Sequence, residues 1–580
     1  MCGIVGIVRT DAPPDQERVA RMLHYLAHRG PDGEGRLLAG QACLGHRRLA
    51  LIDKAGGHQP MQSPDGRFSL VFNGEIYNWR ELREELRHRW HFRTDSDTEV
   101  LLALLALEDE SSLRRLNGMF AFFLWDSEEE RGLAARDPLG VKPFVYSHRD
   151  QEFVFASEAK AIVQSAPNRP RAHADSILEY LTAPFFSGVT HSMFEGVETL
   201  GPGHLLRVSK GTVAVERWWR WKFDSGFEPP TSDSLRAGVD AAIDRSLRAD
   251  APIGAYLSGG LDSTWIAARA KVPCFTVSFD QQSSFDYSRS RIVVSDDEPF
   301  AALAERELEL RRERVHVARA HLAADLDRLS WVNDALPAWE QEIAQLHLAG
   351  AASQKVKAVL VGDAADETHW GYPFLLDDDA TDRPGNIIRR FGPAPIRRDR
   401  LSDPVAHFEA QYRSYTEDAG ESWHSTDTRR AATTRLILER WLPRLLHNGD
   451  IHAMASSIES RVPFADIELL AMAQRIGPRD GFRNGVEKSA LREAARGVLP
   501  DAIRLRRKSA LPKDQANAEV FRSEGSSVLA TSAGFLGEFL DLDAVRILLS
   551  PARPLDERER AILFRVICLA HWARHYGVRA

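Results

Sequence analysis

The sequence is poor in cysteine and contains no long apolar run. Its 580 residues include four cysteines, which lie far apart and form no C-x-x-C pair; this argues against a zinc site and against a disulfide framework. No stretch approaches the roughly 20 apolar residues that a membrane helix needs, so we expect no membrane association. Arg9 and Asp11 interrupt the apolar start of the chain, unlike a secretory signal. We therefore expect a cytoplasmic protein.

The charge balance gives no reason to expect nucleic acid as a partner. The formal net charge is −8, whereas a protein that binds a phosphate backbone needs an excess of basic side chains. The composition, 43% hydrophobic and 27% charged, is typical of a folded globular protein. A chain of 580 residues is too long for one ordinary core, so at least two domains are expected.

The stretch with the most specific chemistry is PIGAYLSGGLDS, residues 252–263. Apolar residues alternate up to Leu257, two glycines follow, and residues 264–271 are compatible with a helix, which predicts a strand, a tight turn and a helix. Gly259 and Gly260 let the backbone curl so that successive N–H groups point at one anion. The helix N-terminus adds donors and the positive end of its dipole. The pattern therefore predicts a phosphate-binding turn.

Three polar side chains of this turn fit the same ligand. Ser258 and Ser263 can donate hydroxyl hydrogen bonds to the anion. Asp262 would repel bare phosphate, so it makes sense as a carboxylate ligand of a Mg²⁺ ion that accompanies the phosphate. The alternative from these residues alone is a glycine turn that ends a buried strand, with the two serines capping the helix.

The N-terminal stretch MCGIVGIV predicts a buried strand that begins close to Cys2. Cys2 could be a small core residue. Removal of Met1 would instead give Cys2 a free α-amino group, whose unperturbed pKa is about 7.7–8.0. Such an amine can act as the base for its own thiol, so Cys2 is also a candidate nucleophile.

A set of motifs in a fixed order resembles a known enzyme family. The N-terminal third contains CGIVGI, HRGPD, HRRL, NGEIYN, SDTEV and RDPLGVKPFVY, and the later part contains SGGLDS, SIESRVPFAD and an E-K-x-x-L-R pattern. Together they resemble the glutamine-hydrolysing asparagine synthetases, which join a class II glutamine amidotransferase domain to an N-type ATP pyrophosphatase domain. The resemblance implies ATP and Mg²⁺ as cofactors and glutamine and a small carboxylate as substrates, and a homodimer is compatible with it.

The resemblance also implies the architecture, a mixture of α+β and α/β domains. Residues 1–215 would form the glutaminase domain, an Ntn-hydrolase αββα sandwich, and residues 216–233 a linker. Residues 234–580 would form a doubly wound parallel-sheet ATP pyrophosphatase domain with a helical C-terminal part. Alternating strand and helix patterns after the linker favour a parallel sheet independently. Within residues 516–580 we predict two amphipathic helices.

For the N-terminal domain the resemblance implies a complete glutaminase site. Cys2 would attack the side-chain amide of glutamine and release ammonia through a glutamyl thioester. The Asn73 side chain and the Gly74 backbone N–H would hold the oxyanion. Each polar residue alone could be a surface charge or a helix cap. The implied glutamine-binding residues are Arg48 for the α-carboxylate and Glu75 and Asp97 for the α-ammonium group.

For the C-terminal domain the resemblance implies a nucleotide site built on several loops. The implied ATP-binding residues are Leu257, Ser258, Gly259, Gly260, Asp262, Ser263, Val277 and Gly362, and the implied metal ligands are Asp262 and Asp366. Lys488, in the E-K-x-x-L-R pattern, would face the charge that develops on the α-phosphate and on pyrophosphate. Arg506-Arg507-Lys508 stays open between a second phosphate contact and a solvated charge run.

One loop departs from the family pattern. Residues 361–372 read VGDAADETHWGY, where asparagine synthetases usually have SGEGSDExFGGY. Asp366 keeps the implied metal-ligand position, and Asp363 replaces the usual glutamate as the implied catalytic carboxylate. The carboxylate at position 363 is therefore one methylene shorter.

The predicted function is a glutamine- and ATP-dependent amide ligase, with L-aspartate as the best candidate acceptor and asparagine, AMP and pyrophosphate as products. Because of the altered loop, an alternative is amidation of a different carboxylate in specialised-metabolite biosynthesis. A lasso-peptide cyclase or a β-lactam synthetase would use an internal amine, and the full set of glutaminase residues favours external ammonia. A third hypothesis is a glutaminase or regulatory binding protein whose C-terminal domain is inactive. The presence of SGGLDS, Asp366 and Lys488 argues against it.

Overall fold

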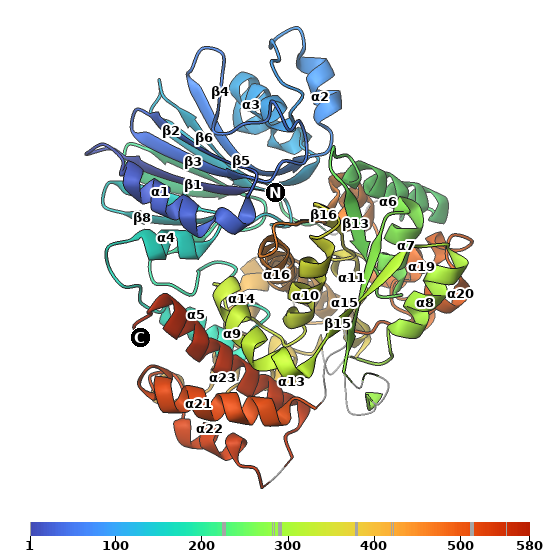
Figure 1. Ribbon diagram of the computed structural model, residues 1–580. Coiled ribbons are helices and arrows are strands. Elements are labelled where there is room, and N and C mark those ends of the chain that lie inside the picture. The colour runs from blue at the N-terminus through green and yellow to red at the C-terminus, as the bar shows by residue number, and fades with distance from the viewer. Residues whose placement is uncertain are drawn as a thin grey trace.

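Figure 1 shows the computed structural model, which describes residues 2–222, 228–280, 282, 285–287, 293–377, 381–418, 420, 423–510, 516–552 and 554–580. The N-terminal part of the chain forms one body, and the rest forms a second body beside it. The predicted linker, residues 216–233, overlaps strand β12 (Thr212–Arg217) and helix α6 (Ser232–Ser246), and its residues 223–227 lie outside the described ones. The division into two domains at these positions stays a prediction.

Two six-stranded antiparallel sheets stack in the N-terminal body. The first has the order β10 (Glu198–Thr199), β8 (Val145–Arg149), β9 (Glu152–Ala156), β1 (Gly3–Arg9), β3 (Ala42–Arg48) and β2 (Gly33–Ala39). The second has the order β12, β11 (His204–Ser209), β7 (Arg131–Arg136), β6 (Gly118–Asp126), β5 (Phe68–Ile76) and β4 (Met61–Gln62). Buried side chains from both sheets, such as Ile4 and Phe123, fill the space between them. The stacked pair is the centre of a sandwich.

Helices cover the outer faces of both sheets (Figure 1). On the first sheet lie α1 (Gln16–Tyr25) and α4 (Ala159–Ser165), and on the second lie α2 (Trp79–Leu86) and α3 (Asp97–Glu108). Strand β1 is buried on both faces, because Ile4 and Val8 face the inner core while Val5 and Ile7 face α1. This explains why its sequence is a nearly continuous apolar run. The predicted αββα sandwich is confirmed.

The C-terminal body is built on one parallel sheet. Its order is β15 (Arg312–Val317), β14 (Cys274–Phe279), β13 (Ile253–Tyr256), β16 (Ala358–Leu360) and β17 (Glu459–Arg461). The chain leaves β13 toward β14 and β15 and then returns to β16 on the other side, so the order reverses between β13 and β16. Open α/β sheets bind ligands at such a switch point, beyond the carboxyl ends of the strands. The predicted doubly wound parallel sheet is confirmed.

Helices lie on either side of this sheet (Figure 1). Helix α10 (Glu342–Ala352) packs on β14 and β15 and against α16 (Leu442–Met454), whereas α7 (Leu261–Ala270) packs on β13 and against α6. The further α-helices of the described residues are α5 (Ala174–Thr182), α8 (Glu298–Glu307), α9 (Leu322–Val332), α11 (Ala365–Thr368), α13 (Pro384–Phe391), α14 (Pro404–Asp418), α15 (Thr426–Leu436), α17 (Ile467–Ala473), α18 (Pro478–Gly481), α19 (Ser489–Ala494), α20 (Asp501–Arg504), α21 (Ala518–Leu536), α22 (Leu542–Leu549) and α23 (Glu557–Tyr576).

The helical C-terminal part differs from the prediction in one respect. Among its described residues it contains three helices, α21, α22 and α23, so the prediction of two was wrong. The shortest of the three is α22, with eight residues. Its start is fixed by Asp541, whose side chain accepts from the N–H groups of Asp543 and Ala544.

Candidate active site

Cys2 lies at the start of β1 with 8% of its surface exposed. Its backbone N–H donates to Asn73 Oδ1 at 3.0 Å, and its carbonyl oxygen accepts from Arg29 Nε at 3.0 Å. Both bonds fix the backbone that carries the thiol. Burial raises the pKa of the Cys2 thiol, and the nearby Glu459 carboxylate adds to the rise. A base beside the thiol is therefore needed before it can act as a nucleophile.

Asn73 and Gly74 lie side by side on β5, next to Cys2. Because Asn73 Oδ1 accepts from the Cys2 N–H, its Nδ2 points elsewhere, and this buried nitrogen has no hydrogen-bond partner among the described residues. A Cβ at Gly74 would collide with the Met119 carbonyl oxygen on β6, so the backbone approach there requires glycine. The site thus holds an unused amide donor within reach of the Cys2 backbone, and such donors stabilise oxyanions.

Arg48 ends β3 and turns its guanidinium toward a loop. Its Nη1 donates to the Lys54 carbonyl oxygen at 2.8 Å and its Nη2 to the Asp53 carbonyl oxygen at 2.6 Å. In the described part of the chain no carboxylate lies within ion-pair distance of it. The cation is held in place without being neutralised, as a carboxylate-binding arginine should be.

Glu75 and Asp97 are the two buried carboxylates of the sequence-predicted glutamine site. Glu75 Oε1 pairs with Arg461 Nη2 at 3.2 Å, and Glu75 Oε2 has no hydrogen-bond partner in the described residues. Asp97 Oδ2 accepts from the Ile76 N–H at 3.0 Å, which ties it to the end of β5. Burial raises the pKa of Asp97 to about 6 and that of Glu75 well above its usual value. A bound ammonium group would favour the ionised form of both.

The predicted phosphate turn connects β13 to α7. Ser263 Oγ accepts from the Ser258 N–H at 3.2 Å and lies 3.0 Å from Ser258 Oγ, so the two hydroxyls converge. Gly259 has φ +69°, and a Cβ there would collide with the backbone of Phe300 and Ala301. Gly260 is the N-cap of α7 and provides no side-chain cap, which leaves the first N–H groups available to an anion.

Two lysines and two aspartates, one of them Asp262 of the turn itself, meet beside the two serines. Lys488 Nζ lies 2.5 Å from Asp262 Oδ2 and 2.8 Å from Asp366 Oδ1, and Lys508 Nζ lies 2.7 Å from Asp366 Oδ2. Burial alone would raise the pKa of Asp366, but the two ammonium groups lower it to about 2. Lys488 is 3% exposed and has a left-handed backbone, so it is no exposed helix lysine. The cluster combines carboxylates and cations at the switch point of the sheet.

Asp363 stands slightly apart from this cluster. It is half-buried and lies against Gly449 of α16, where a Cβ would be 3.4 Å from its Oδ2. Burial raises its pKa to about 6, and Asp366 and Asp262 contribute to the rise. Of the remaining predicted nucleotide residues, Leu257 directly follows β13, Gly362 lies two positions after β16, and Val277 lies within β14. The predicted residues of the C-terminal domain thus lie at or near the carboxyl-terminal edge of the parallel sheet.

A charged seam between the two bodies escaped the sequence-based prediction. Arg29 Nη1 pairs with Glu158 at 2.7 Å and Arg29 Nη2 with Asp450 at 2.7 Å, while Lys142 Nζ lies 3.5 Å from Asp450. Asp450 belongs to α16 and the others belong to the N-terminal body. The HRGPD motif contains Arg29, and the SIESRVPFAD motif begins seven residues after Asp450. Neither motif indicates that Arg29 and Asp450 pair.

The second part of the seam lies beside the glutaminase residues. Arg461 of β17 pairs with Glu75 at 3.2 Å and with Glu459 at 2.5 Å. The C-terminal body thus provides an arginine and a glutamate to the surroundings of Cys2, although the sequence assigned neither a role.

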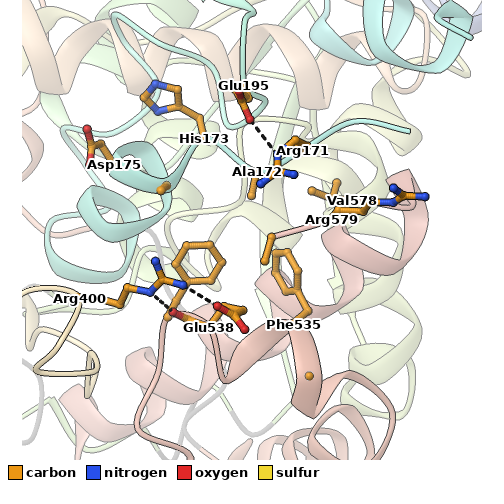
Figure 2. A pocket seen from close by; sticks show the side chains of 14 residues that line it. Arg171, Ala172, His173, Asp175, Glu195, Arg400, Phe535, Glu538, Val578 and Arg579 are labelled. Atoms are coloured by element: carbon orange, nitrogen blue, oxygen red, sulfur yellow. Dashed lines mark hydrogen bonds and ion pairs between the residues drawn. The ribbon is translucent and has the colours of Figure 1, made fainter. Parts of the chain in front are cut away.

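A cavity of about 770 Å³ lies away from both groups of residues, where α5 and α21 approach the end of the chain (Figure 2). Arg171 pairs with Glu195 at 3.1 Å and Arg400 pairs with Glu538 at 2.5 Å across its walls. None of the sequence-predicted site residues lines it. The predicted site residues lie in the other two places, around Cys2 and around the phosphate turn.

Two family models match the chain. Residues 1–219 match the glutamine amidotransferase domain, and residues 234–574 match asparagine synthase. Glutamine-hydrolyzing asparagine synthetase 3 of Bacillus subtilis is 30% identical, with 88% of this chain and 87% of that protein covered. A putative asparagine synthetase of Mycobacterium tuberculosis has the same identity and coverage. Amidase chry2 of Gibberella zeae is 26% identical, with 87% of each protein covered.

The fold and the two matched domains define a glutamine-dependent carbon–nitrogen ligase, in which an amidotransferase domain is joined to a parallel-sheet ligase domain. More specifically, the chain belongs to the glutamine-hydrolysing asparagine synthetase family, as the motifs predicted. No helix among the described residues is long and apolar enough to cross a membrane.

Proposed function

We propose that the enzyme hydrolyses glutamine at Cys2 and uses the ammonia to amidate a carboxylate that its C-terminal domain has joined to AMP. The observation that carries the N-terminal half is the buried Asn73 amide, whose Oδ1 orients the Cys2 N–H while Nδ2 is left as a donor. The convergence of the SGGLDS turn with Asp262, Asp366 and Lys488 supports the C-terminal half.

In the glutaminase step, removal of Met1 frees the Cys2 α-amino group to act as the base. The thiol gives its proton to this amine, and its sulfur bonds to the amide carbon of glutamine. The Asn73 Nδ2 and the Gly74 N–H hold the oxyanion. The carbon–nitrogen bond then breaks, ammonia leaves with the proton, and water hydrolyses the thioester to glutamate. Arg48 would bind the α-carboxylate, and Glu75 and Asp97 the α-ammonium group.

In the ligase step, an oxygen of the acceptor carboxylate bonds to the α-phosphorus of ATP. The bond between that phosphorus and the bridging oxygen of the β-phosphate breaks, and pyrophosphate leaves. Ammonia then attacks the acyl carbon and AMP departs. The N–H groups and hydroxyls of the SGGLDS turn would hold pyrophosphate, and Lys488 would face the charge that develops during its departure.

The carboxylates of the cluster fit a Mg²⁺ ion bound together with ATP. Asp262 Oδ2 and Asp366 Oδ1 already converge on one cation, Lys488 Nζ, at 2.5 and 2.8 Å. Mg²⁺ is usually held by one or two carboxylates plus phosphate oxygens, so no larger protein cage is needed. Within the described residues no three His, Cys, Asp or Glu side chains form such a cage. Bound there, Mg²⁺ would neutralise phosphate charge.

The proposed acceptor of the ammonia is a small carboxylate. L-aspartate is the best candidate, because two of the relatives carry the name asparagine synthetase. The alternative is a different carboxylate in specialised metabolism, since residues 361–372 depart from the usual family pattern and Asp363 stands where glutamate is usual. The relative called an amidase is compatible with that alternative.

A pyrophosphate-release assay tests the proposal. Purified enzyme is given ATP, Mg²⁺ and glutamine with a panel of carboxylates that includes L-aspartate. We expect pyrophosphate and amide product in equal amounts with one carboxylate. Glutamine hydrolysis without pyrophosphate release for any carboxylate would leave only a glutaminase and would contradict the proposed ligase.

A further inference from the structure

The loop that holds the Arg48 guanidinium centres on Asp53. Arg48 Nη2 donates to the Asp53 carbonyl oxygen at 2.6 Å, and the same oxygen accepts from the Gly57 N–H at 3.0 Å. Asp53 has a left-handed backbone, φ +44°, which is uncommon for a residue other than glycine. A Cβ at Gly57 would lie 2.7 Å from Arg48 Nη2, so the loop closes tightly around the guanidinium. We call residues 52–57 the Arg48 loop.

The Asp53 side chain connects the Arg48 loop to the other half of the predicted glutamine site. Its Oδ1 accepts from the Gly56 N–H at 2.8 Å, within the loop, and its Oδ2 accepts from the Asp95 N–H at 2.9 Å. Asp95 lies two positions before Asp97, the implied partner of the α-ammonium group. Asp53 therefore contacts both segments that would hold the charged ends of free glutamine.

The backbone N–H of Asp53 is bound by the other body. It donates to Asp250 Oδ2 at 2.9 Å, and the Asp250 N–H donates to the Leu51 carbonyl oxygen at 2.8 Å. Asp250 lies three positions before strand β13 of the parallel sheet. A carboxylate that accepts from an N–H makes a charge-assisted hydrogen bond, which is stronger than a neutral one. The C-terminal body thus holds the residue on which the Arg48 loop centres.

An apolar contact beside these bonds also joins the two bodies. Leu49 and Leu51 pack against Met454 of α16, with the half-buried Ala251 at the edge of the group. Leu49, Leu51 and Met454 are at most 3% exposed. Because this packing does not involve the Asp250 side chain, the two segments should stay in contact when that side chain is removed.

We propose that Asp250 is a positioning residue for glutamine: through the Asp53 backbone it sets the loop that holds the Arg48 guanidinium. The inference rests on the proposed function, because it requires Arg48 to bind the α-carboxylate of glutamine. A guanidinium forms two parallel hydrogen bonds to a carboxylate only over a narrow range of positions, so a small shift of Asp53 weakens this contact. The ligase body then contributes to the affinity for glutamine without touching it.

Steady-state glutamine hydrolysis by the full-length enzyme tests the inference. Asp250→Ala removes the acceptor of the Asp53 N–H, and we expect the KM for glutamine to rise roughly three- to tenfold, as for the loss of one hydrogen bond. The kcat should stay within about twofold of the wild type, because Cys2 and the oxyanion donors are unchanged. Asp250→Asn keeps an oxygen that can accept from the same N–H, and it should restore most of the affinity.

Glu81→Ala is the matched control. Glu81 is another exposed carboxylate that bonds across the boundary between the two bodies, to Arg248 at 3.1 Å, and among the described residues its side chain bonds to no residue of the Arg48 loop. Its loss should leave the KM for glutamine unchanged. Urea unfolding midpoints are recorded for every variant. The ammonium-dependent synthesis and the KM for ATP should stay at wild-type values throughout, because neither depends on glutamine binding.

A double-mutant cycle tests whether Asp250 acts through Arg48. Arg48→Ala alone should raise the KM for glutamine strongly, since the α-carboxylate loses its cation. In that background Asp250→Ala should add less than about twofold, because the loop no longer holds a guanidinium. If the two changes instead multiply, Asp250 acts by another route and the inference is overturned.

Failure of the inference can be told apart from failure of the proposed function. If the wild type does not hydrolyse glutamine, or if Arg48→Ala leaves the KM for glutamine unchanged, the proposed glutamine site itself fails. If Arg48→Ala raises this KM while Asp250→Ala behaves like Glu81→Ala, only the role of Asp250 fails. A rise in the KM for ATP in place of the KM for glutamine would also overturn the inference.

Discussion

Arg29 and Asp450 form a 2.7 Å ion pair although 421 positions separate them in the chain. The same guanidinium donates from Nε to the carbonyl oxygen of Cys2, the predicted nucleophile. On the other side, Asp450 follows Gly449 on α16, and Gly449 lies against Asp363 of the proposed ligase site. Arg29 and the part of α16 that contains Gly449 and Asp450 therefore connect the surroundings of Cys2 with those of Asp363.

Asp450→Ala should lower the stability of the fold. The change leaves the buried Arg29 with one carboxylate instead of two, and we expect a loss of about 1–3 kcal/mol in the free energy of unfolding. Urea denaturation measures it. Asp543→Ala is the control, because its carboxylate pairs with Arg546 while 89% exposed, and exposed pairs contribute little. Equal midpoints for both variants would show that the seam is not stabilising.

Cys2→Ala should separate the two activities. Without the thiol no glutamyl thioester can form, so glutamine-dependent amide synthesis should disappear. Ammonium salts bypass this step, and the ammonium-dependent rate should stay within about twofold of wild type, since Cys2 lies outside the nucleotide cluster. Amide formation is followed with each nitrogen source. Loss of both activities would refute the division of labour between the domains.

Asn73→Ala tests the unpartnered amide. Removing an oxyanion donor should lower the glutaminase kcat by about 10²–10³-fold with a smaller change in KM, because the donor acts mainly in the transition state. Glutamate release is measured under saturating glutamine. The ammonium-dependent reaction of the same variant serves as its internal control. A change confined to KM would mean that Asn73 binds glutamine without stabilising the oxyanion.

Much of the fold was predictable because its signals are local. The apolar alternation before Leu257 and the glycines after it identified the turn, and both predicted architectures are confirmed. The helix after the turn begins at Leu261, three residues before the predicted start at Thr264, because Asp262 and Ser263 take helical backbone directly after the N-cap Gly260. Asp262 and Ser263 thus lie in its first turn, where their backbone N–H groups have no partner within the helix.

The pairings across the site were not predictable. Lys508 meets Asp366 over 142 positions, and Arg29 meets Asp450 over 421. Arg506-Arg507-Lys508 has the composition of a solvated charge run, and only the fold shows that its first and third members point inward. Charge pairs between distant segments depend on how whole domains pack, and a local sequence pattern does not predict that packing.

The seam should make the enzyme sensitive to acid. Burial opposes ionisation of Glu158, but His28, Lys160 and Arg29 hold its pKa well below the usual value. A carboxyl with a depressed folded pKa stabilises the protein above its unfolded pKa of about 4.3, and this contribution is lost as the pH falls through the folded value. Wild type should therefore lose stability below about pH 4.3 more steeply than Glu158→Gln. Unfolding midpoints from pH 7 downward measure the slopes, and parallel curves for the two proteins would contradict the prediction.

Asp262→Asn should stop the ligase and spare the glutaminase. Asp262 is the carboxylate of the phosphate turn, and Lys488 pairs with both Asp262 and Asp366. The charge of Asp262 therefore helps to hold the proposed metal ion and to fix the position of the Lys488 ammonium group. Replacing it with a neutral amide should lower pyrophosphate release by about 10²-fold or more, because a metal-bridged phosphate loses a charged ligand. Glutamine hydrolysis depends on residues of the other body and should continue.

Asp244→Asn makes the same change on the neighbouring helix α6, where the carboxylate pairs with Arg269 at the surface, and should leave both activities intact. Normal pyrophosphate release from Asp262→Asn would contradict the placement of ATP at this turn. Loss of both pyrophosphate release and glutamine hydrolysis would indicate a folding defect, which circular dichroism can detect.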